Sequence, residues 1–129
     1  MEKTNGGAII IEQPGMKMTI EHRHGLGGKD EGLTFDVTTT GADEGKRIDR
    51  FDCFYKEPHY HIGTSGEYKN RKMKDEGIGD PVRWTLDQLR TRFPALVIQA
   101  GYGDIAATID QKAVADQLTH MEAEIRAKY

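Results

Sequence analysis

Apolar and polar side chains alternate most regularly over residues 16–24. A period of two is typical of a β-strand that turns one face toward a core. Four further segments, rich in β-branched or aromatic residues, lie at 8–12, 33–38, 47–55 and 59–63, and glycine or proline punctuates the chain between them. Because the connections are short, the pattern predicts an antiparallel meander of four to five strands.

The pattern changes toward the C-terminus, where alanine replaces glycine as the common small residue. Thr85–Gln88 has the spacing of a capping box and predicts a helix over 85–93. Proline begins a second, short helix expected over 94–101, and a final helix is expected over 111–128. The apolar stripe of that last helix consists of Val114, Leu118, Met121 and Ile125.

Together the two patterns predict an α+β fold in one domain, residues 1–129. In this fold, two to three C-terminal helices pack on one face of the N-terminal meander. The hydrophobic fraction of 36% and the charged fraction of 30% are typical of a globular protein.

Composition and charge constrain the cellular compartment and the class of partner, but they do not indicate an activity. The net charge of −3 gives no general attraction to nucleic acid or to anionic lipid. No apolar run approaches the ~18 residues of a membrane helix, and we find no secretory signal. Cys53 is the single cysteine, which excludes an internal disulfide and fits a reducing compartment. We therefore expect a cytoplasmic protein whose partner is neither a membrane nor nucleic acid.

Four of the five histidines lie in two pairs with a spacing of two, His22 with His24 and His59 with His61. On a strand, that spacing puts both imidazoles of a pair on the same face. The first pair shares the parity of the apolar residues of 16–24, which predicts hydrogen-bonded histidines at the rim of the core. The second pair alternates with apolar residues and is expected to face outward. Parity therefore favours two separate pairs.

Alternation also places charged residues of neighbouring strands on the side of the second pair. The candidate metal ligands on this face are His59, His61, Asp52 and Asp36. Two imidazoles and one or two carboxylates could hold a divalent cation, zinc or a similar ion. Without a metal, the same face could carry acid–base chemistry. The candidate catalytic residues are then His59, His61, Asp52 and Arg50.

The segment Arg50-Phe-Asp-Cys-Phe, followed by Pro58-His-Tyr-His, resembles a family of small prokaryotic proteins of uncharacterised function. Gly79-Asp-Pro and Trp84 extend the resemblance, which covers about residues 16–102. The resemblance implies no activity, and it assigns no catalytic role to any histidine.

Three hypotheses for function remain open. The first, which we favour from the sequence, is a non-catalytic interaction module that binds a protein partner. The second is a metal-binding protein or metal-dependent hydrolase that uses His59, His61 and Asp52. The third is a ribonuclease-like protein in which histidines act as acid and base and the basic run 69–74 holds phosphate. Apolar side chains on both sides of 47–55 further predict a homodimer.

Overall fold

A seven-stranded antiparallel sheet forms the N-terminal part of the chain in the computed structural model, which describes residues 3–5 and 7–129. Each strand pairs with its neighbours in the sequence. The strands are β1 (Lys3–Asn5), β2 (Ala8–Gln13), β3 (Met16–His24), β4 (Glu31–Thr39), β5 (Arg47–Phe54), β6 (His59–Ile62) and β7 (Arg71–Lys72). The predicted α+β class and antiparallel meander are confirmed, but the prediction of four to five strands was too low. The additional strands, β1 and β7, have only three and two residues, too few to display an alternation.

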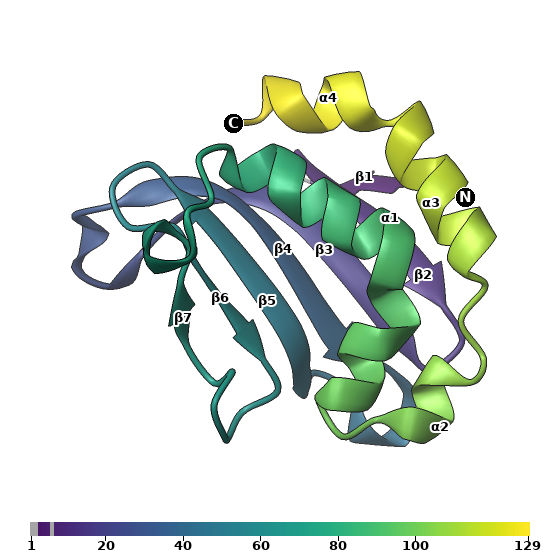
Figure 1. Cartoon of the computed structure of the whole chain (residues 1–129). Helices are drawn as coiled ribbons and strands as arrows, with labels where there is room; N and C mark the ends of the chain where they lie inside the picture. The colour runs from purple at the N-terminus through teal and green to yellow at the C-terminus, as the bar shows by residue number, and fades with distance from the viewer. Residues whose placement is uncertain (1–2, 6) are drawn as a thin grey trace.

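Helices cover one face of this sheet (Figure 1). They are α1 (Pro81–Gln99), α2 (Gly103–Ala106), α3 (Gln111–His120) and α4 (Glu122–Ala127), and the connections contain three short 3-10 turns, η1 (Leu26–Gly28), η2 (Gly41–Asp43) and η3 (Lys74–Glu76). Four α-helices exceed the predicted two to three, because the final helix is interrupted at Met121 and α2 is a separate single turn. In the described part of the chain, no helix is long and apolar enough to cross a membrane.

The start of α1 differs from the predicted capping box. Asp80 is the N-cap, since its side chain accepts a hydrogen bond from the amide of Arg83 at 3.1 Å, and Pro81 follows as the first helical residue. Thr85 is instead buried inside the helix, where its Oγ1 lies 3.5 Å from Sγ of Cys53. Burial raises the pKa of the Cys53 thiol to about 12, which makes it a poor nucleophile.

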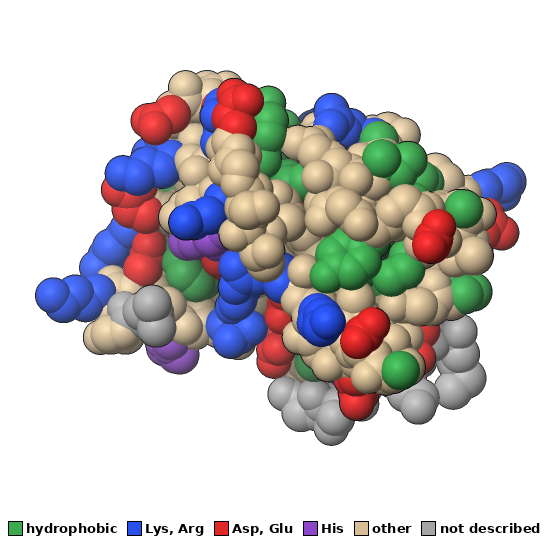
Figure 2. Space-filling view, turned by 90° about the horizontal axis from the view of Figure 1, so that it is seen from below, with side chains coloured by type: hydrophobic (Ala, Val, Ile, Leu, Met, Phe, Trp, Pro, Cys, Tyr) green, Lys and Arg blue, Asp and Glu red, His purple; other side chains and the backbone are tan. Residues whose placement is uncertain are grey.

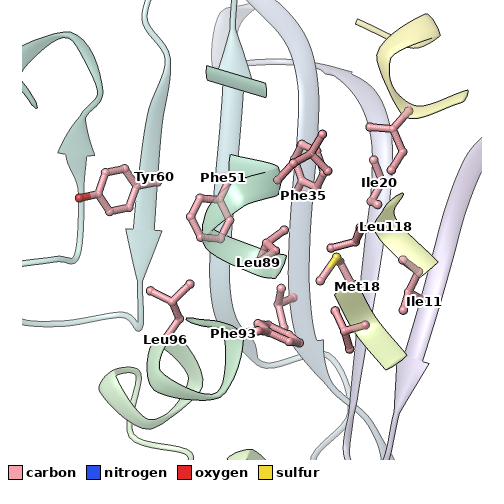
Figure 3. Packing of buried hydrophobic residues seen from close by; sticks show 14 of the residues in the cluster. Ile11, Met18, Ile20, Phe35, Phe51, Tyr60, Leu89, Phe93, Leu96 and Leu118 are labelled. Atoms are coloured by element: carbon pink, nitrogen blue, oxygen red, sulfur yellow. The ribbon is translucent and has the colours of Figure 1, made fainter. Parts of the chain in front are cut away.

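The core lies between the sheet and the helices (Figure 3). Phe35 and Phe51 point from the central strands toward Leu89 and Phe93 of α1, while Leu118 of α3 covers the neighbouring strands. All five side chains are fully buried. Burial of each such side chain contributes about 1.5–3 kcal/mol, so this layer orients the strands that carry the site on the opposite face.

A kink in α1 is stabilised by one side chain from α3. Pro94 has no N–H and leaves the carbonyl of Arg90 without its helical partner, and the backbone is non-helical immediately before Phe93. Gln111 supplies the missing partners: its Oε1 accepts from the amide of Phe93 at 2.8 Å, and its Nε2 donates to the carbonyls of Leu89 at 3.1 Å and Arg90 at 3.0 Å. The continuous but kinked α1 replaces the two helices expected over 85–93 and 94–101.

We expect Gln111→Leu to destabilise the protein by about 2–4 kcal/mol, because it leaves one amide and two carbonyls of the kink without partners. Urea unfolding of the wild type and the variant measures the difference. The matched control is Gln117→Leu on the same helix, since Gln117 makes no side-chain hydrogen bond to the described residues. Equal losses in the two variants would contradict the role of Gln111.

A β-bulge in β5 changes which side chains face the helices. The register shifts between Val37 and Thr38 of β4, and Ile48 on β5 is left without an opposing residue. Ile48 joins the buried core, although simple alternation predicts the opposite face. Phe54, the other apolar residue on that opposite face, is covered within the chain by Gly25, where an added Cβ would lie 2.9 Å from the Phe54 ring. These two residues therefore no longer support the homodimer, which stays a prediction.

Asp49 follows the bulge and lies on the helix-covered face, opposite Val37 and Ile62. Its side chain is fully buried, and neither carboxylate oxygen has a hydrogen-bond partner among the described residues. The nearby amide of Gly63 lowers the pKa of this carboxyl only in part, since it donates to the carbonyl of Ile48 at 2.8 Å. Burial therefore raises the pKa of Asp49 to about 8.

Replacing Asp49 with Asn should remove a pH dependence of stability. The carboxyl ionises near pH ~3.9 in the unfolded chain but only at about pH 8 in the folded protein. The folded state therefore binds the extra proton, and stability falls as pH rises through this window, by up to about 1.4 kcal/mol per pH unit. Urea unfolding at several pH values should show this fall in the wild type and in the exposed control Asp104→Asn. Parallel curves for the wild type and Asp49→Asn would contradict the assignment.

Candidate metal centre

The face of β5 and β6 that points away from the helices carries a compact charged cluster. Antiparallel pairing sets Asp52 opposite His59 and Arg50 opposite His61. The intervening residues, such as Phe51, point into the core. The structure thus brings together all four of the residues predicted as catalytic candidates.

The carboxylate of Asp52 lies at the centre of this cluster, with only 6% of its side chain exposed. Arg50 donates from Nε to Oδ1 of Asp52 at 3.1 Å. The other oxygen, Oδ2, lies 3.0 Å from Nε2 of His59 and 3.5 Å from Nε2 of His61. The guanidinium therefore occupies one carboxylate oxygen and leaves the second to both imidazoles.

Backbone carbonyls orient both imidazoles from their far sides. Nδ1 of His59 lies 2.9 Å from the carbonyl oxygen of Glu57, and Nδ1 of His61 lies 2.7 Å from that of Lys69. A carbonyl oxygen can only accept, so both Nδ1 atoms carry the hydrogen. Nε2 of each ring, 3.0 Å or 3.5 Å from Oδ2 of Asp52, is then a lone pair when the ring is neutral and an N–H donor when the ring is protonated.

Asp30 holds the turn that leads into β6. Its Oδ1 accepts from the amide of Lys56 at 3.0 Å, and its Oδ2 accepts from the amide of Glu57 at 2.8 Å. Burial alone would raise the pKa of Asp30, but its hydrogen bonds from backbone amides lower it. Because Glu57 supplies the carbonyl that orients His59, Asp30 is a positioning residue for the cluster.

The cluster shifts the pKa values of its acid and of one of its bases in opposite directions. Burial would raise the pKa of Asp52, but hydrogen bonds from His59 and His61 and the charge of Arg50 hold it well below its usual range. The hydrogen bond to Asp52 raises the pKa of His59, although burial opposes this effect. Asp52 is therefore an anion across the physiological range.

Asp52, His59 and His61 could hold a metal ion, because one ligand atom from each lies within 4.8 Å of the other two. Ligand atoms about 2.0–2.2 Å from a tetrahedral zinc ion lie about 3.3–3.6 Å from one another. The observed separations of 3.0 and 3.5 Å between Oδ2 and the two Nε2 atoms are close to that spacing. Asp36, the fourth predicted ligand, is not in this group: its Oδ2 lies 3.8 Å from Nη1 of Arg23.

The other pair of histidines lies apart from this group. His22 contacts Glu31 through Nε2 at 2.8 Å and the carbonyl of Lys128 through Nδ1 at 3.1 Å. The hydrogen bond to Glu31 raises the pKa of His22. His24 is more exposed and reaches the rim of the cavity beside the second pair. The expectation of hydrogen-bonded histidines at the edge of the core therefore agrees with His22, whereas His24 lines the same cavity as the second pair.

An open cavity of about 480 Å³ lies beside the cluster. Arg23 from β3, Arg47 and Arg50 from β5, and Asn70 from the connection between β6 and β7 line it. Asp52 is the single carboxylate among its lining residues. Figure 2 shows blue Lys and Arg side chains beside a purple histidine and red Asp or Glu side chains at a hollow of the surface.

Sequence reasoning missed two of these arginines. An unbroken alternation points Arg47 into the core with Phe51, but the bulge at Ile48 turns Arg47 outward on the side of Arg50. Arg23 follows the alternation of β3. Because Met18 points into the core and Arg23 has the opposite parity, the sequence could have placed Arg23 on the face of the cluster.

Two basic residues of the run 69–74 bind different partners within the chain. Arg71 lies 2.9 Å from Glu76 and 3.5 Å from Glu67, so neighbouring carboxylates offset its charge. Nζ of Lys74 donates to the carbonyl of Lys56 at 2.6 Å. Arg71 and Lys74 are therefore already engaged by groups of this chain.

Comparison with known proteins places the chain in a family. Residues 10–125 match a family model described as a domain of unknown function, DUF7700. The chain belongs to this family. The match spans most of the chain and agrees with the resemblance to an uncharacterised family. Comparison of the DUF7700 chain with curated proteins found no match, and comparison with solved structures found none.

Asp52→Asn should lower the pKa of His59, because the hydrogen bond to the anionic carboxylate is what raises it. NMR titration of the histidine ring protons, with chelator present, measures the change. His22 is the internal control, since its pKa is raised by Glu31 and should stay the same in the variant. An unchanged pKa of His59 would show that Asp52 does not bind the imidazole in solution.

Proposed function

We propose that this protein binds one divalent transition-metal ion between Asp52, His59 and His61. The observation that carries the proposal is the commitment of both Nδ1 atoms to backbone carbonyls at 2.9 and 2.7 Å. It leaves two Nε2 atoms available beside one carboxylate oxygen, all within 4.8 Å of one another. Metal-binding histidines typically donate their other ring N–H to a carbonyl or carboxylate in this way.

The contacts between Nε2 and Oδ2 need a positive centre. An unprotonated Nε2 that lies 3.0 Å from a carboxylate oxygen is repelled by it unless a proton or a metal ion is bound by the two atoms. One proton can satisfy one imidazole, whereas a metal ion satisfies both imidazoles and the carboxylate together. The convergence of His59 and His61 on the same oxygen of Asp52 therefore favours a metal over a single protonated histidine.

The ligand set indicates the class of ion. Two imidazole nitrogens and one carboxylate oxygen suit zinc and the neighbouring first-row metals, whereas magnesium and calcium prefer oxygen alone. Three protein ligands leave at least one coordination position free. That position would face the cavity lined by Arg23 and Arg47. A metal ion there could act as a Lewis acid on a bound ligand, as the hydrolase hypothesis requires.

The geometry favours this hypothesis over the interaction module that the sequence first suggested. An interaction surface has no need for three convergent ligand atoms or for a carboxylate that is 6% exposed. Asp52 is more readily explained as a ligand whose second oxygen Arg50 keeps in place. The binding of a protein partner stays a prediction.

Elemental analysis of the untagged protein, purified without chelator and then equilibrated with zinc, tests the proposal. We expect close to one ion per chain in the wild type and a loss of at least about tenfold in affinity in His59→Ala/His61→Ala. Substitution with cobalt provides a second readout, since its visible absorption reports nitrogen and oxygen ligands and their number.

His120→Ala is the matched control, because His120 is an exposed histidine on α3, far along the chain from the cluster. It should bind metal as the wild type does. Circular dichroism checks that the double variant keeps its fold. Equal metal content in the wild type and the double variant, or none in the wild type at saturating zinc, would overturn the proposal.

A further inference from the structure

The cavity beside the candidate centre carries more positive charge than its carboxylate can balance. Arg23, Arg47 and Arg50 line it together with Asp52. Asp36 lies 3.8 Å from Arg23, but it can offset only one guanidinium. A divalent ion would increase the excess further. Guanidinium groups gathered in a cavity are typical of sites that bind oxyanions, because their planar donors match such oxygens in pairs.

The three arginines differ in how strongly the chain already holds them. Arg50 donates to Asp52 at 3.1 Å and is part of the cluster itself. Arg23 makes only the long contact with Asp36, and 39% of its side chain is exposed. The side chain of Arg47 has no hydrogen bond or ion pair with any residue that the structure describes. Arg23 and Arg47 are therefore available to a ligand without the loss of a short contact.

We infer that this cavity binds the phosphate group of a small phosphomonoester, held between the metal ion and the guanidiniums of Arg23 and Arg47. The inference rests on the proposed metal site. A phosphate dianion has enough oxygens to coordinate a metal ion and to accept from two guanidiniums at once, whereas a carboxylate has two oxygens and one charge. The phosphate is thus the oxyanion that best matches the charge and the donors present.

The cavity also has room for the organic part of such a ligand. Its volume of about 480 Å³ lies within the range of about 300–1,000 Å³ that is usual for small-molecule sites. Phe54 lines it and packs edge-on against His59, with 5.5 Å between ring centroids. This aromatic pair supplies an apolar wall next to the phosphate position.

A small ligand fits better than a polynucleotide. Nucleic-acid binding needs positive charge that follows a backbone over many phosphates. Outside the cavity, Arg71 is paired with Glu76 at 2.9 Å, and Lys74 is bound to a backbone carbonyl at 2.6 Å. The net charge of the chain is −3. Arg71 and Lys74 are therefore already engaged by other groups, whereas Arg23 and Arg47 in the cavity make no such short contact with the described residues.

Titration calorimetry with phenyl phosphate, on protein loaded with zinc and freed of excess metal, tests the inference. Arg23→Gln and Arg47→Gln should each weaken binding by about tenfold or more, the usual effect of losing a hydrogen bond between charged groups. Arg83→Gln is the matched control, because Arg83 lies on α1, outside the cavity lining, and 71% of its side chain is exposed. Arg83→Gln should bind phenyl phosphate as tightly as the wild type does. The wild type should bind benzoate more weakly than phenyl phosphate.

The outcomes separate this inference from the proposed metal site. Zinc-loaded protein that fails to bind phenyl phosphate, or that binds it equally well in Arg23→Gln and Arg47→Gln, would overturn the inference and leave the metal site intact. Binding to metal-free protein that still requires both arginines would support the phosphate site and count against its dependence on the metal. Tighter binding of a single-stranded RNA oligomer than of phenyl phosphate would overturn the assignment of a small ligand.

Discussion

The pairing of β5 with β6 is the constraint on which the candidate centre depends. It sets Asp52 opposite His59 and, on the other face, stacks Phe51 on Tyr60 with ring planes 14° apart. A slip of one residue would send the histidine into the core and the aromatic rings into water. Burial of apolar rings on one face therefore determines which polar groups meet on the other. The chemistry of the outer face is a consequence of packing on the inner one.

Two aspartates of β5 show that the face of the sheet on which a carboxyl lies determines the direction of its pKa shift. Neither oxygen of Asp49 has a hydrogen-bond partner among the described residues, and burial raises its pKa to about 8. Asp52, on the opposite face, is also largely buried, but donors from Arg50 and two imidazoles surround it and lower its pKa. Burial acts in the same direction on both carboxyls, so the partners alone account for the opposite outcomes. The same strand thus carries one neutral acid and one anion.

Hydrogen bonds between distant segments fix the details of both faces. Asp30 holds the turn whose Glu57 carbonyl orients His59, and Gln111 supplies the partners that the kinked α1 lacks next to Pro94. Both residues act on backbone groups that the local structure leaves unsatisfied, because a buried amide or carbonyl without a partner is costly. Neither Asp30 nor Gln111 is part of a local sequence motif that would predict its role.

The sequence by itself determined the antiparallel meander, the C-terminal helices and the shared face of Arg50, Asp52, His59 and His61, because alternation is a local property that one strand expresses alone. It failed where a single residue breaks the period, as at the bulge that turns Arg47 into the cavity. Only the tertiary structure decided which imidazole nitrogen faces Asp52 and which arginines surround it. Those features arise from contacts between segments far apart in the chain, and no local pattern of residues encodes them.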